Sequence, residues 1–402
     1  MKTVAIISEY NPFHSGHLYQ IQRIREEFGE DTRIVAIMSG NFTQRAEVAI
    51  ADKSARAKMA VLSGVNLVLE LPFPYSMGSA ELFARAGVSI AEGLGCIDVL
   101  SFGSECGDIS LLTETAALMR STPFLTTLDT VQRENSLLGH AKVLEITLAK
   151  YIGADNAKAL LCPNNILALE YLKAIKDLGG SIIPHTIARN GADYRCTEKT
   201  EDTHQSAGAI RKSLLEDNML LSVYIPKAAR AVLAEEIDKG AAPCKEEKLS
   251  SAILSYFRLN KPTASCKFMD AKGGLYNRLI TKSYEAHDIS SLAALTETKK
   301  FTNARIRRAI WFSFFGVTSS EAKTLPKFTR VLALDKVGQS VLRDAKSQAS
   351  ISVFSKPSER PLCKETAQQK ELADRADAVF QLTKPDKTSG SYAMLTSPFF
   401  KG

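Results

Sequence analysis

Four short apolar runs, each followed by a stretch in which apolar residues recur at helical spacing, constrain the fold of this chain most strongly. The apolar runs are residues 4–8, 33–38, 66–71 and 97–102. The helical stretches between them are residues 15–28, 52–63 and 79–94. Strand and helix thus alternate, which predicts a parallel sheet with helices on both of its faces.

The alternation fades after about residue 215. A fifth strand is expected over residues 181–187, and the remainder is predicted to be mainly helical, with candidate strands at 330–334 and 350–354. We therefore expect an α/β domain in residues 1–215 and a mainly helical domain in residues 216–402. The last twenty residues are rich in Pro, Gly, Ser and Lys, and we expect them to be loosely held.

The composition excludes several classes of protein. The chain has 402 residues, of which 45% are hydrophobic and 24% charged, as in globular proteins. No apolar run approaches the roughly 18 residues of a membrane span, and the N-terminus lacks a signal-type apolar region, so we expect a cytoplasmic protein with no membrane contact. The seven cysteines are scattered without a CxxC pair, which favours reduced thiols over disulfides or a zinc site.

The charge is unevenly distributed between the two halves. Residues 1–215 carry 21 Lys and Arg against 24 Asp and Glu, whereas residues 216–402 carry 30 against 20. The basic excess therefore belongs to the second half, and it indicates a polyanionic partner such as RNA there.

Two of the six histidines lie in the sequence His14-Ser15-Gly16-His17, between the first expected strand and the first expected helix. Helix N-termini bind phosphates because their first N–H groups are unpaired and partially positive. Two imidazoles one turn apart are suited to stabilising an α-phosphate during nucleotidyl transfer. Two alternative roles stay open: the histidines cap or pack the helix, or they bind a metal, although His-x-x-His alone is a poor ligand pair.

The chain contains neither GxxxxGK[ST] nor GxGxxG, the common rival phosphate loops. HxGH at this position resembles the HIGH-type signature of the nucleotidyltransferase superfamily, whose second signature is an ISSTxIR-like segment that opens a later helix. Residues 205–211 match it at Ser206, Ile210 and Arg211 but have Ala207 and Gly208 where hydroxyl residues are usual. Only Ser206 and Arg211 therefore carry over as phosphate contacts, and Ser206 is equally suited to capping the helix.

Longer strings resemble the bacterial tRNA(Met) cytidine acetate ligase family. The matching segments are residues 9–18, 38–45, 52–60, 68–72, 102–105, 163–171 and 272–278. The resemblance runs from residue 1 to about residue 310 and thins beyond it. The chain has Ala46 and Val48 where the family usually shows QRGEPA, and Ser54 where an aromatic residue often follows Asp-Lys.

This resemblance implies a HIGH-type nucleotidyltransferase (Rossmann-like) domain that binds ATP, followed by a mainly helical, basic domain that binds tRNA. It implies that acetate attacks the α-phosphate of ATP and releases pyrophosphate. The N4 amine of the wobble cytidine (C34) of elongator tRNA(Met) then takes the acetyl group from acetyl-adenylate, giving N4-acetylcytidine and AMP. Mg²⁺ suits this chemistry, but no motif demands a metal, and no stable protein partner is evident.

The site residues follow from the motifs and the resemblance together. The predicted catalytic residues are His14 and His17. The predicted ATP contacts are Ile7, Ser8, Glu9, Tyr10, Asn11, Pro12, Phe13, His14, Ser15, Gly16, His17, Leu18, Tyr19, Gln20, Gly103, Asn165, Arg189, Ser206 and Arg211. The predicted RNA contacts are Arg45, Lys53, Arg56, Lys299, Lys300, Arg305 and Arg308. Without the resemblance, a strand-end turn, a helix cap and exposed basic helix faces account for most of these residues equally well.

Two other functions stay open. A small-molecule adenylyl- or cytidylyltransferase needs no RNA and leaves the basic second half unexplained. A non-catalytic RNA-binding protein, with a degenerate nucleotidyltransferase domain as its scaffold, is favoured by the departures at Ala207 and Gly208.

Overall fold

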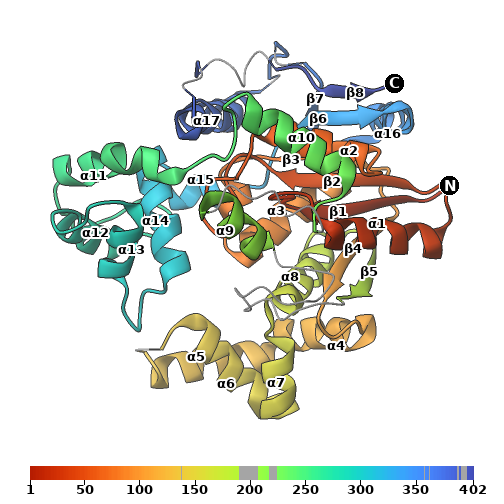
Figure 1. Cartoon of the computed structure of the whole chain (residues 1–402). Coiled ribbons are helices and arrows are strands. Elements are labelled where there is room, and N and C mark those ends of the chain that lie inside the picture. The colour runs from red at the N-terminus through yellow and green to blue at the C-terminus, as the bar shows by residue number, and fades with distance from the viewer. Residues whose placement is uncertain are drawn as a thin grey trace.

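A sheet of eight strands runs through the centre of the computed structural model (Figure 1), which describes residues 1–136, 138–189, 207–216, 224–356, 358–361, 363–386, 389–390 and 396–402. The strands are β1 (Thr3–Ser8), β2 (Arg33–Ser39), β3 (Leu67–Leu71), β4 (Val99–Ser104), β5 (Ile183–Ala188), β6 (Phe328–Asp335), β7 (Ser352–Phe354) and β8 (Phe399–Lys401). They lie in the order β5-β4-β1-β2-β3-β6-β7, and β8 also pairs with β6.

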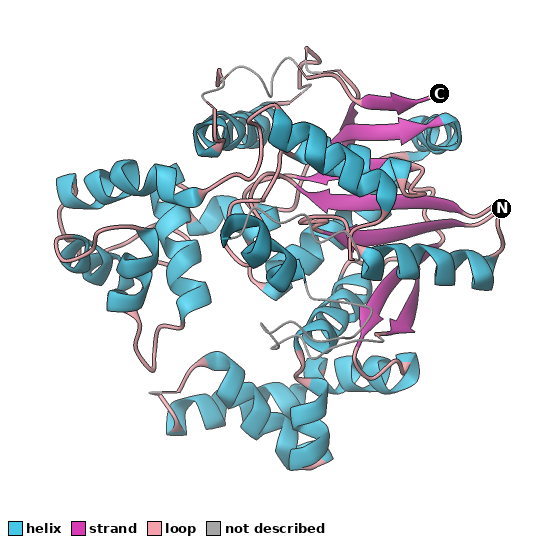
Figure 2. Cartoon of the chain, in the orientation of Figure 1, coloured by secondary structure: helices cyan, strands magenta, loops and turns pink. Residues whose placement is uncertain are grey.

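Helices surround this sheet and extend beyond one of its edges (Figure 2). Those of the first half are α1 (Ser15–Phe28), α2 (Lys53–Leu62), α3 (Ala80–Leu94), α4 (Ile109–Arg120), α5 (Thr122–Glu134), α6 (His140–Ile152), α7 (Ala154–Leu160), α8 (Pro163–Asp177) and α9 (Ala207–Glu216). Those of the second half are α10 (Lys227–Asp238), α11 (Ser250–Leu259), α12 (Leu275–Ser283), α13 (Ile289–Thr296), α14 (Asn303–Phe315), α15 (Ser319–Lys323), α16 (Lys336–Gln348) and α17 (Lys364–Phe380). Short 3₁₀ helices cover Tyr75–Met77, Glu246–Leu249 and Gln381–Thr383.

The first five strands are parallel, as the alternating sequence pattern predicted. β1 pairs with β2 from Thr3 opposite Arg33 to Ser8 opposite Met38, so these two strands end level with each other. β4 lies on the other side of β1, and β5 continues the sheet beyond it. The carboxyl ends of these strands meet at one edge of the sheet, which is where open α/β sheets bind their ligands.

Side chains along each strand alternate between two apolar layers. Val35 and Ile37 of β2 face the layer covered by α3, α8 and α16, whereas Ile34 and Ala36 face the layer covered by α1, α2 and α10. Because both faces are covered, these strands are almost continuously apolar in sequence, as buried parallel strands are. No helix in the described part of the chain is long and apolar enough to cross a membrane.

The end of the chain returns to this sheet, which corrects the expected division at residues 215/216. The candidate strands near residues 330 and 350 are confirmed as β6 and β7, and β6 pairs antiparallel with β3. Within the tail that we expected to be loosely held, Phe399–Lys401 form β8, which pairs with β6. The physical reason is that β3 would otherwise present an open apolar edge, and a distant segment covers it. The sheet therefore draws on both of the predicted domains.

Helices α11 to α14 form a separate group, here called the helical module, which lies beyond the carboxyl edge of the sheet (Figure 1). Its core contains Trp311 and Phe315 of α14. Phe42, which follows β2, lies 5.2 Å from the Trp311 ring centroid, and Phe73, which follows β3, lies 4.8 Å from that of Phe315. The module is thus packed on the loops that leave the sheet at this edge.

Candidate functional site

His14 and His17 form the N-terminal cap of α1. The Nδ1 atom of His14 accepts the N–H of Gly16 at 3.1 Å, and the Nδ1 atom of His17 accepts the N–H of His14 at 3.1 Å. A neutral imidazole whose Nδ1 accepts carries its proton on Nε2, so this pattern gives both rings an Nε2–H donor. The two rings stack with their centroids 3.8 Å apart. Capping therefore does occur, and it aligns the two donors instead of competing with a phosphate role.

Aromatic residues of the same loop keep His17 neutral. Tyr10 lies edge-on to the His17 ring at 4.8 Å between centroids, and Phe13 lies at 5.4 Å. Burial lowers the pKa of His17 well below its ordinary value, and repulsion from His14 when that ring is protonated, and from Arg189, lowers it further. At neutral pH, His17 is therefore an uncharged hydrogen-bond donor with a fixed tautomer.

Gly103 in β4, Asn165 in α8 and Arg189, which follows β5, lie around the loop that follows β4. A Cβ added at Gly103 would lie 3.2 Å from Cγ of Arg189, so the glycine lets this arginine lie across the end of β4. Asn165 is buried, and its Oδ1 accepts the N–H groups of Glu105 and Cys106 at 2.9 and 3.2 Å. Its Nδ2 donates to Ala159 O at 3.0 Å, so Asn165 shapes the loop through its side chain.

Glu105 is a further residue of this loop, and sequence reasoning missed its role. Its carboxylate accepts the backbone N–H groups of Asn164 and Asn165, in the first turn of α8, at 3.1 and 2.7 Å. A carboxylate is favoured at a helix N-terminus, so Glu105 fixes α8 to the end of β4. The matching segment 102–105 contained it, but no local pattern indicated that its partner lies about 60 residues later.

Two arginines lie beside the loop that holds the histidines. Arg211 of α9 donates to Asn11 O and to the Glu47 carboxylate, both at 3.1 Å. Burial and the neighbouring charge of Arg211 lower the pKa of Arg45, while Glu9 and Glu47 raise it. Arg45 and Arg211 thus form a partly buried cationic pair next to the helix N-terminus, an arrangement suited to phosphate oxygens. Ser206 lies outside the described residues.

The structure corrects the RNA-contact assignment of Lys53 and Arg56. Arg56 is 0% exposed and donates to the carbonyl oxygens of Ala51, Glu9 and Gly40 at 3.0, 2.6 and 2.5 Å. Burial lowers its pKa to about 10, so it stays charged while it holds the loop after β1 against the end of β2. Helical spacing indicated an exposed basic face, but the 13 residues between β2 and α2 fold over it.

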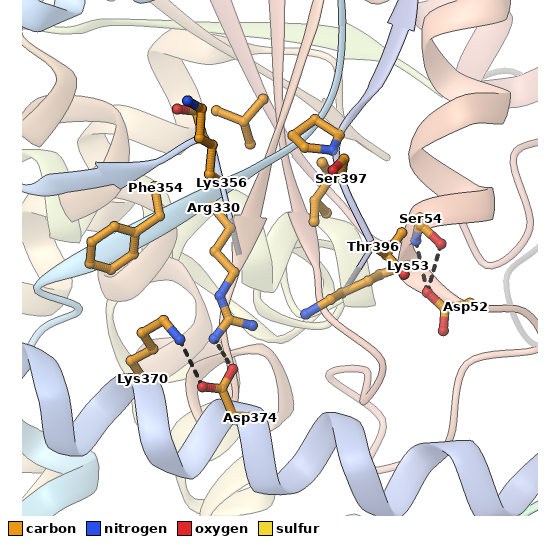
Figure 3. Close-up of a pocket in the computed structure, with 14 residues that line it drawn as sticks. Asp52, Lys53, Ser54, Arg330, Phe354, Lys356, Lys370, Asp374, Thr396 and Ser397 are labelled. Carbon is orange, nitrogen blue, oxygen red and sulfur yellow. Dashed lines mark hydrogen bonds and ion pairs between the residues drawn. The ribbon is translucent and has the colours of Figure 1, made fainter. Parts of the chain in front are cut away.

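Lys53 is 5% exposed and, like Arg330, lines a pocket (Figure 3). It belongs to a buried ion cluster. Its Nζ lies 2.6 Å from Glu70 and 2.5 Å from Asp377, and Arg330 contacts the same Asp377 at 3.1 Å. Burial disfavours the charged form of Lys53, but Asp377 and Glu70 outweigh it and raise its pKa. Asp377 lies on α17, more than 300 residues along the chain, so the local sequence gave no sign of this partner.

Two arginines of the basic helix α14 have partners within the protein. Arg305 donates to the carbonyl oxygens of Asp270 and Lys272, both at 3.1 Å, and Arg308 pairs with the Asp270 carboxylate at 2.5 Å. Both guanidinium groups hold the loop before α12 while they stay partly exposed, and their contact with RNA stays a prediction. Lys299 and Lys300, in the turn before α14, are exposed and stay predicted RNA contacts.

The carbonyl of Ala46 links α14 to the loop between β2 and α2. It accepts hydrogen bonds from Arg307 Nε and Nη2, at 3.3 and 3.2 Å, and from Trp311 Nε1 at 3.1 Å. Ala46 has φ 58°, a left-handed conformation that favours glycine. The sequence contained one signal for this conformation: the family's QRGEPA string has glycine at the position of Ala46, and glycine there indicates a positive φ.

The described residues contain no group of three or more His, Cys, Asp or Glu side chains placed to hold a metal ion. Cys96, Cys106, Cys162, Cys244, Cys266 and Cys363 are free thiols, and Cys196 lies outside the described residues. Two neutral imidazole donors, one helix N-terminus and two arginines therefore provide the chemistry at this edge of the sheet. Such a set stabilises negative charge on a phosphate chain without supplying a covalent nucleophile.

Comparison with known proteins gives consistent results over nearly the whole chain. A family model described as HIGH Nucleotidyl Transferase matches residues 1–393. A tRNA(Met) cytidine acetate ligase from Thermoanaerobacter sp. is 35% identical over 363 residues, which cover 89% of this chain and 90% of that protein. The protein of the same name from Acetivibrio thermocellus is 34% identical over 371 residues, 89% of each. The crystal structure of Thermotoga maritima TmcAL bound with alpha-thio ATP is 27% identical and superposes with a TM-score of 0.90 over 100% of this chain and 99% of that one.

Proposed function

The chain belongs to the HIGH nucleotidyl transferase family and, within it, to the tRNA(Met) cytidine acetate ligases, and we propose that it uses ATP and acetate to form N4-acetylcytidine at the wobble position of elongator tRNA(Met). The observation that carries this proposal is the pair of Nε2–H donors on His14 and His17 at the start of α1. The likeness to an ATP-analogue-bound structure supports ATP as the nucleotide. The same proposal places the protein in the cytoplasm, where tRNA is modified.

In the first half-reaction, a carboxylate oxygen of acetate attacks the α-phosphorus of ATP, and the bond to the bridging oxygen of pyrophosphate breaks. Negative charge grows on the α-phosphate oxygens as phosphorus becomes five-coordinate, and the Nε2–H groups of His14 and His17 stabilise it. Neutral donors suit this step: the low pKa of the His17 imidazolium leaves the ring uncharged, and the remaining Nε2–H of a neutral imidazole is too weakly acidic to be transferred. Arg45 and Arg211 would hold the departing pyrophosphate.

In the second half-reaction, the N4 amine of cytidine attacks the acetyl carbonyl of acetyl-adenylate. The carbon–oxygen bond to AMP breaks, the amine loses a proton, and AMP leaves with the electron pair. Gly103 of β4, Asn165 of α8 and Arg189, which follows β5, would hold the adenosine through both steps, since they lie around the end of β4, next to β1. Their contribution is positioning, which can supply a large part of the rate enhancement in such transfers.

Mg²⁺ enters this proposal only as the ion that accompanies ATP. Its ligands would be phosphate oxygens and water, as is usual for Mg²⁺ bound with a nucleotide, because the described residues offer no cluster of carboxylates. The histidine pair binds no metal in this scheme, since each Nδ1 is already engaged in the helix cap.

The experiment that tests the function is nucleoside analysis of tRNA(Met) after incubation with the protein and labelled acetate, with and without ATP. We expect label in N4-acetylcytidine only when ATP is present. Labelled acetyl-adenylate without labelled RNA would limit the protein to the first half-reaction. Pyrophosphate exchange with a phosphorylated metabolite in place of acetate would support a small-molecule nucleotidyltransferase. RNA binding with no ATP turnover would support an inactive scaffold.

A further inference from the structure

The helical module has a groove at the surface, with a volume of about 710 Å³, between residues 263–277 and residues 318–320. None of the residues that line it is acidic. Lys267 and Lys272 line it, together with the hydroxyl groups of two threonines and three serines. A lining of cations and hydroxyl donors without carboxylates is suited to an anionic ligand.

The lysines around this groove are available for a ligand. Lys267, Lys272, Lys299 and Lys300 are exposed, and within the described part of the chain none of them forms an ion pair. Lys300 lies close to the groove, because its Nζ would be 3.8 Å from a Cβ added at Gly273. This contrasts with Arg305 and Arg308, whose guanidinium groups are already engaged.

Those two arginines give the groove a defined shape. Arg305 binds the carbonyl oxygens of Asp270 and Lys272, and Arg308 binds the Asp270 carboxylate, so the wall that carries Lys272 is fixed from behind. Gly273 and Gly274 follow with φ 75° and 89°, and α12 then begins without a side-chain cap. Backbone without side chains at a helix N-terminus lets a phosphate approach closely.

We propose that this groove binds the sugar–phosphate backbone of the RNA substrate and thereby holds the tRNA while its anticodon reaches the histidine pair. The proposal rests on the proposed function for the identity of the RNA. The helical module lies beyond the carboxyl edge of the sheet, the same edge at which α1 begins (Figure 1). An RNA bound on the module would then have to reach along this edge to the histidine pair. Lysines act as point charges on flexible stems, so they position a backbone and do not read bases.

The test compares the full-length protein with a Lys267→Ala/Lys272→Ala variant in binding to a tRNA(Met) transcript between about 50 and 200 mM salt. Loss of two phosphate contacts should weaken binding about tenfold or more at the lower salt concentration and make the slope of log K against log salt shallower by about 1.5. Lys336→Ala/Lys364→Ala, which removes two exposed lysines from the starts of α16 and α17, should leave both quantities unchanged. Lys267→Arg/Lys272→Arg should retain most of the affinity.

Two activity measurements, ATP–pyrophosphate exchange and tRNA acetylation, distinguish a failure of the groove proposal from a failure of the proposed function. Acetate-dependent ATP–pyrophosphate exchange should be unchanged in Lys267→Ala/Lys272→Ala, while the KM for tRNA rises and kcat is kept. If the wild-type protein acetylates tRNA but Lys267→Ala/Lys272→Ala binds tRNA with unchanged affinity, the proposal that the groove binds RNA is wrong. It is also wrong if Lys336→Ala/Lys364→Ala weakens binding equally. A loss of exchange would also overturn it, because the lysines would then act on the nucleotide site. If the wild-type protein forms no N4-acetylcytidine, the proposed function fails instead.

Discussion

Helices α1 and α2 both begin at the carboxyl edge of the sheet, after β1 and β2, yet only the start of α1 is suited to a phosphate. His14 caps α1 with a neutral ring, and Ser15, Gly16 and His17 stay partly exposed. Asp52 caps α2, and its carboxylate brings a negative charge of its own to that helix end. The comparison teaches that a helix N-terminus binds an anion only when its cap is neutral and nothing covers it.

Coverage is the second difference between these two helix starts. The C-terminal part of the chain packs over α2, so that Lys384 lies 3.4 Å from Asp52 and α17 supplies Asp377 to Lys53. The small pocket that remains there is lined by paired charges such as Arg330, Lys370 and Asp374 (Figure 3). The start of α2 is therefore a structural joint between distant parts of the chain.

The largest expected effect is on stability, from Lys53→Met. The substitution leaves the buried carboxylates of Glu70 and Asp377 with the Arg330 guanidinium as their remaining shared cation, and removing one partner of such a buried ion cluster costs about 3–5 kcal/mol. Urea unfolding measures the loss. The matched control is Lys58→Met on the same helix, whose ion pair with Glu235 is partly exposed and should cost about 1 kcal/mol or less. If Lys53→Met cost no more than the control and weakened RNA binding, the original surface assignment would be restored.

A substitution at the start of α1 should lower the enzymatic activity and leave the stability of the fold largely unchanged. His14→Asn keeps a side chain that caps helices but removes the Nε2–H donor, so folding should be retained. Loss of one preorganised donor to a developing oxyanion lowers rates by about 10²–10³. Acetate-dependent ATP–pyrophosphate exchange measures this, with the exposed His140→Asn as the control. An exchange rate within twofold of the wild-type rate would remove His14 from the catalytic role.

The low pKa of His17 predicts a pH dependence of stability. Burial of the ring and nearby charges lower this pKa, so in acid the unfolded chain binds a proton more readily than the folded protein. Stability should therefore fall below about pH 6.5, by at most about 1.4 kcal/mol per pH unit. Urea unfolding at pH 7.0 and 5.5 should show this loss in the wild type but not in His17→Gln, which keeps a capping-box residue. Identical pH slopes for the two proteins would contradict it.

The smallest effect is expected at Ala46, in the loop that precedes α2. Its φ of 58° is strained for alanine, so Ala46→Gly should stabilise the protein slightly, by about 1 kcal/mol or less after the entropy of glycine is included. Ala294→Gly on the exposed face of α13 should instead destabilise by about 1 kcal/mol. Thermal unfolding of the two variants compares them directly. Equal destabilisation would show that Ala46 carries no strain.

Much of the local geometry of the candidate site could be predicted from the sequence because it depends on neighbouring residues. The strand, the turn and the helix start lie within residues 3–17, and the capping geometry of His14 and His17 depends only on residues three apart. The parallel direction of the first five strands follows from the same local alternation, whereas their order in the sheet does not. Arg211 was found through a motif, although the partners that it contacts, Asn11 and Glu47, were not.

The sequence by itself determined the elements, their periodicity and the neutral cap of α1, since each of these depends on residues within one or two turns of one another. Only the tertiary structure decided which charges reach solvent. Lys53 is buried by α17, far along the chain, and Arg56 by the loops after β1 and β2, while Arg305 and Arg308 are occupied by the loop before α12. A cation looks the same in sequence whether it faces water or a buried carboxylate, because the cost of desolvation depends on what packs over it.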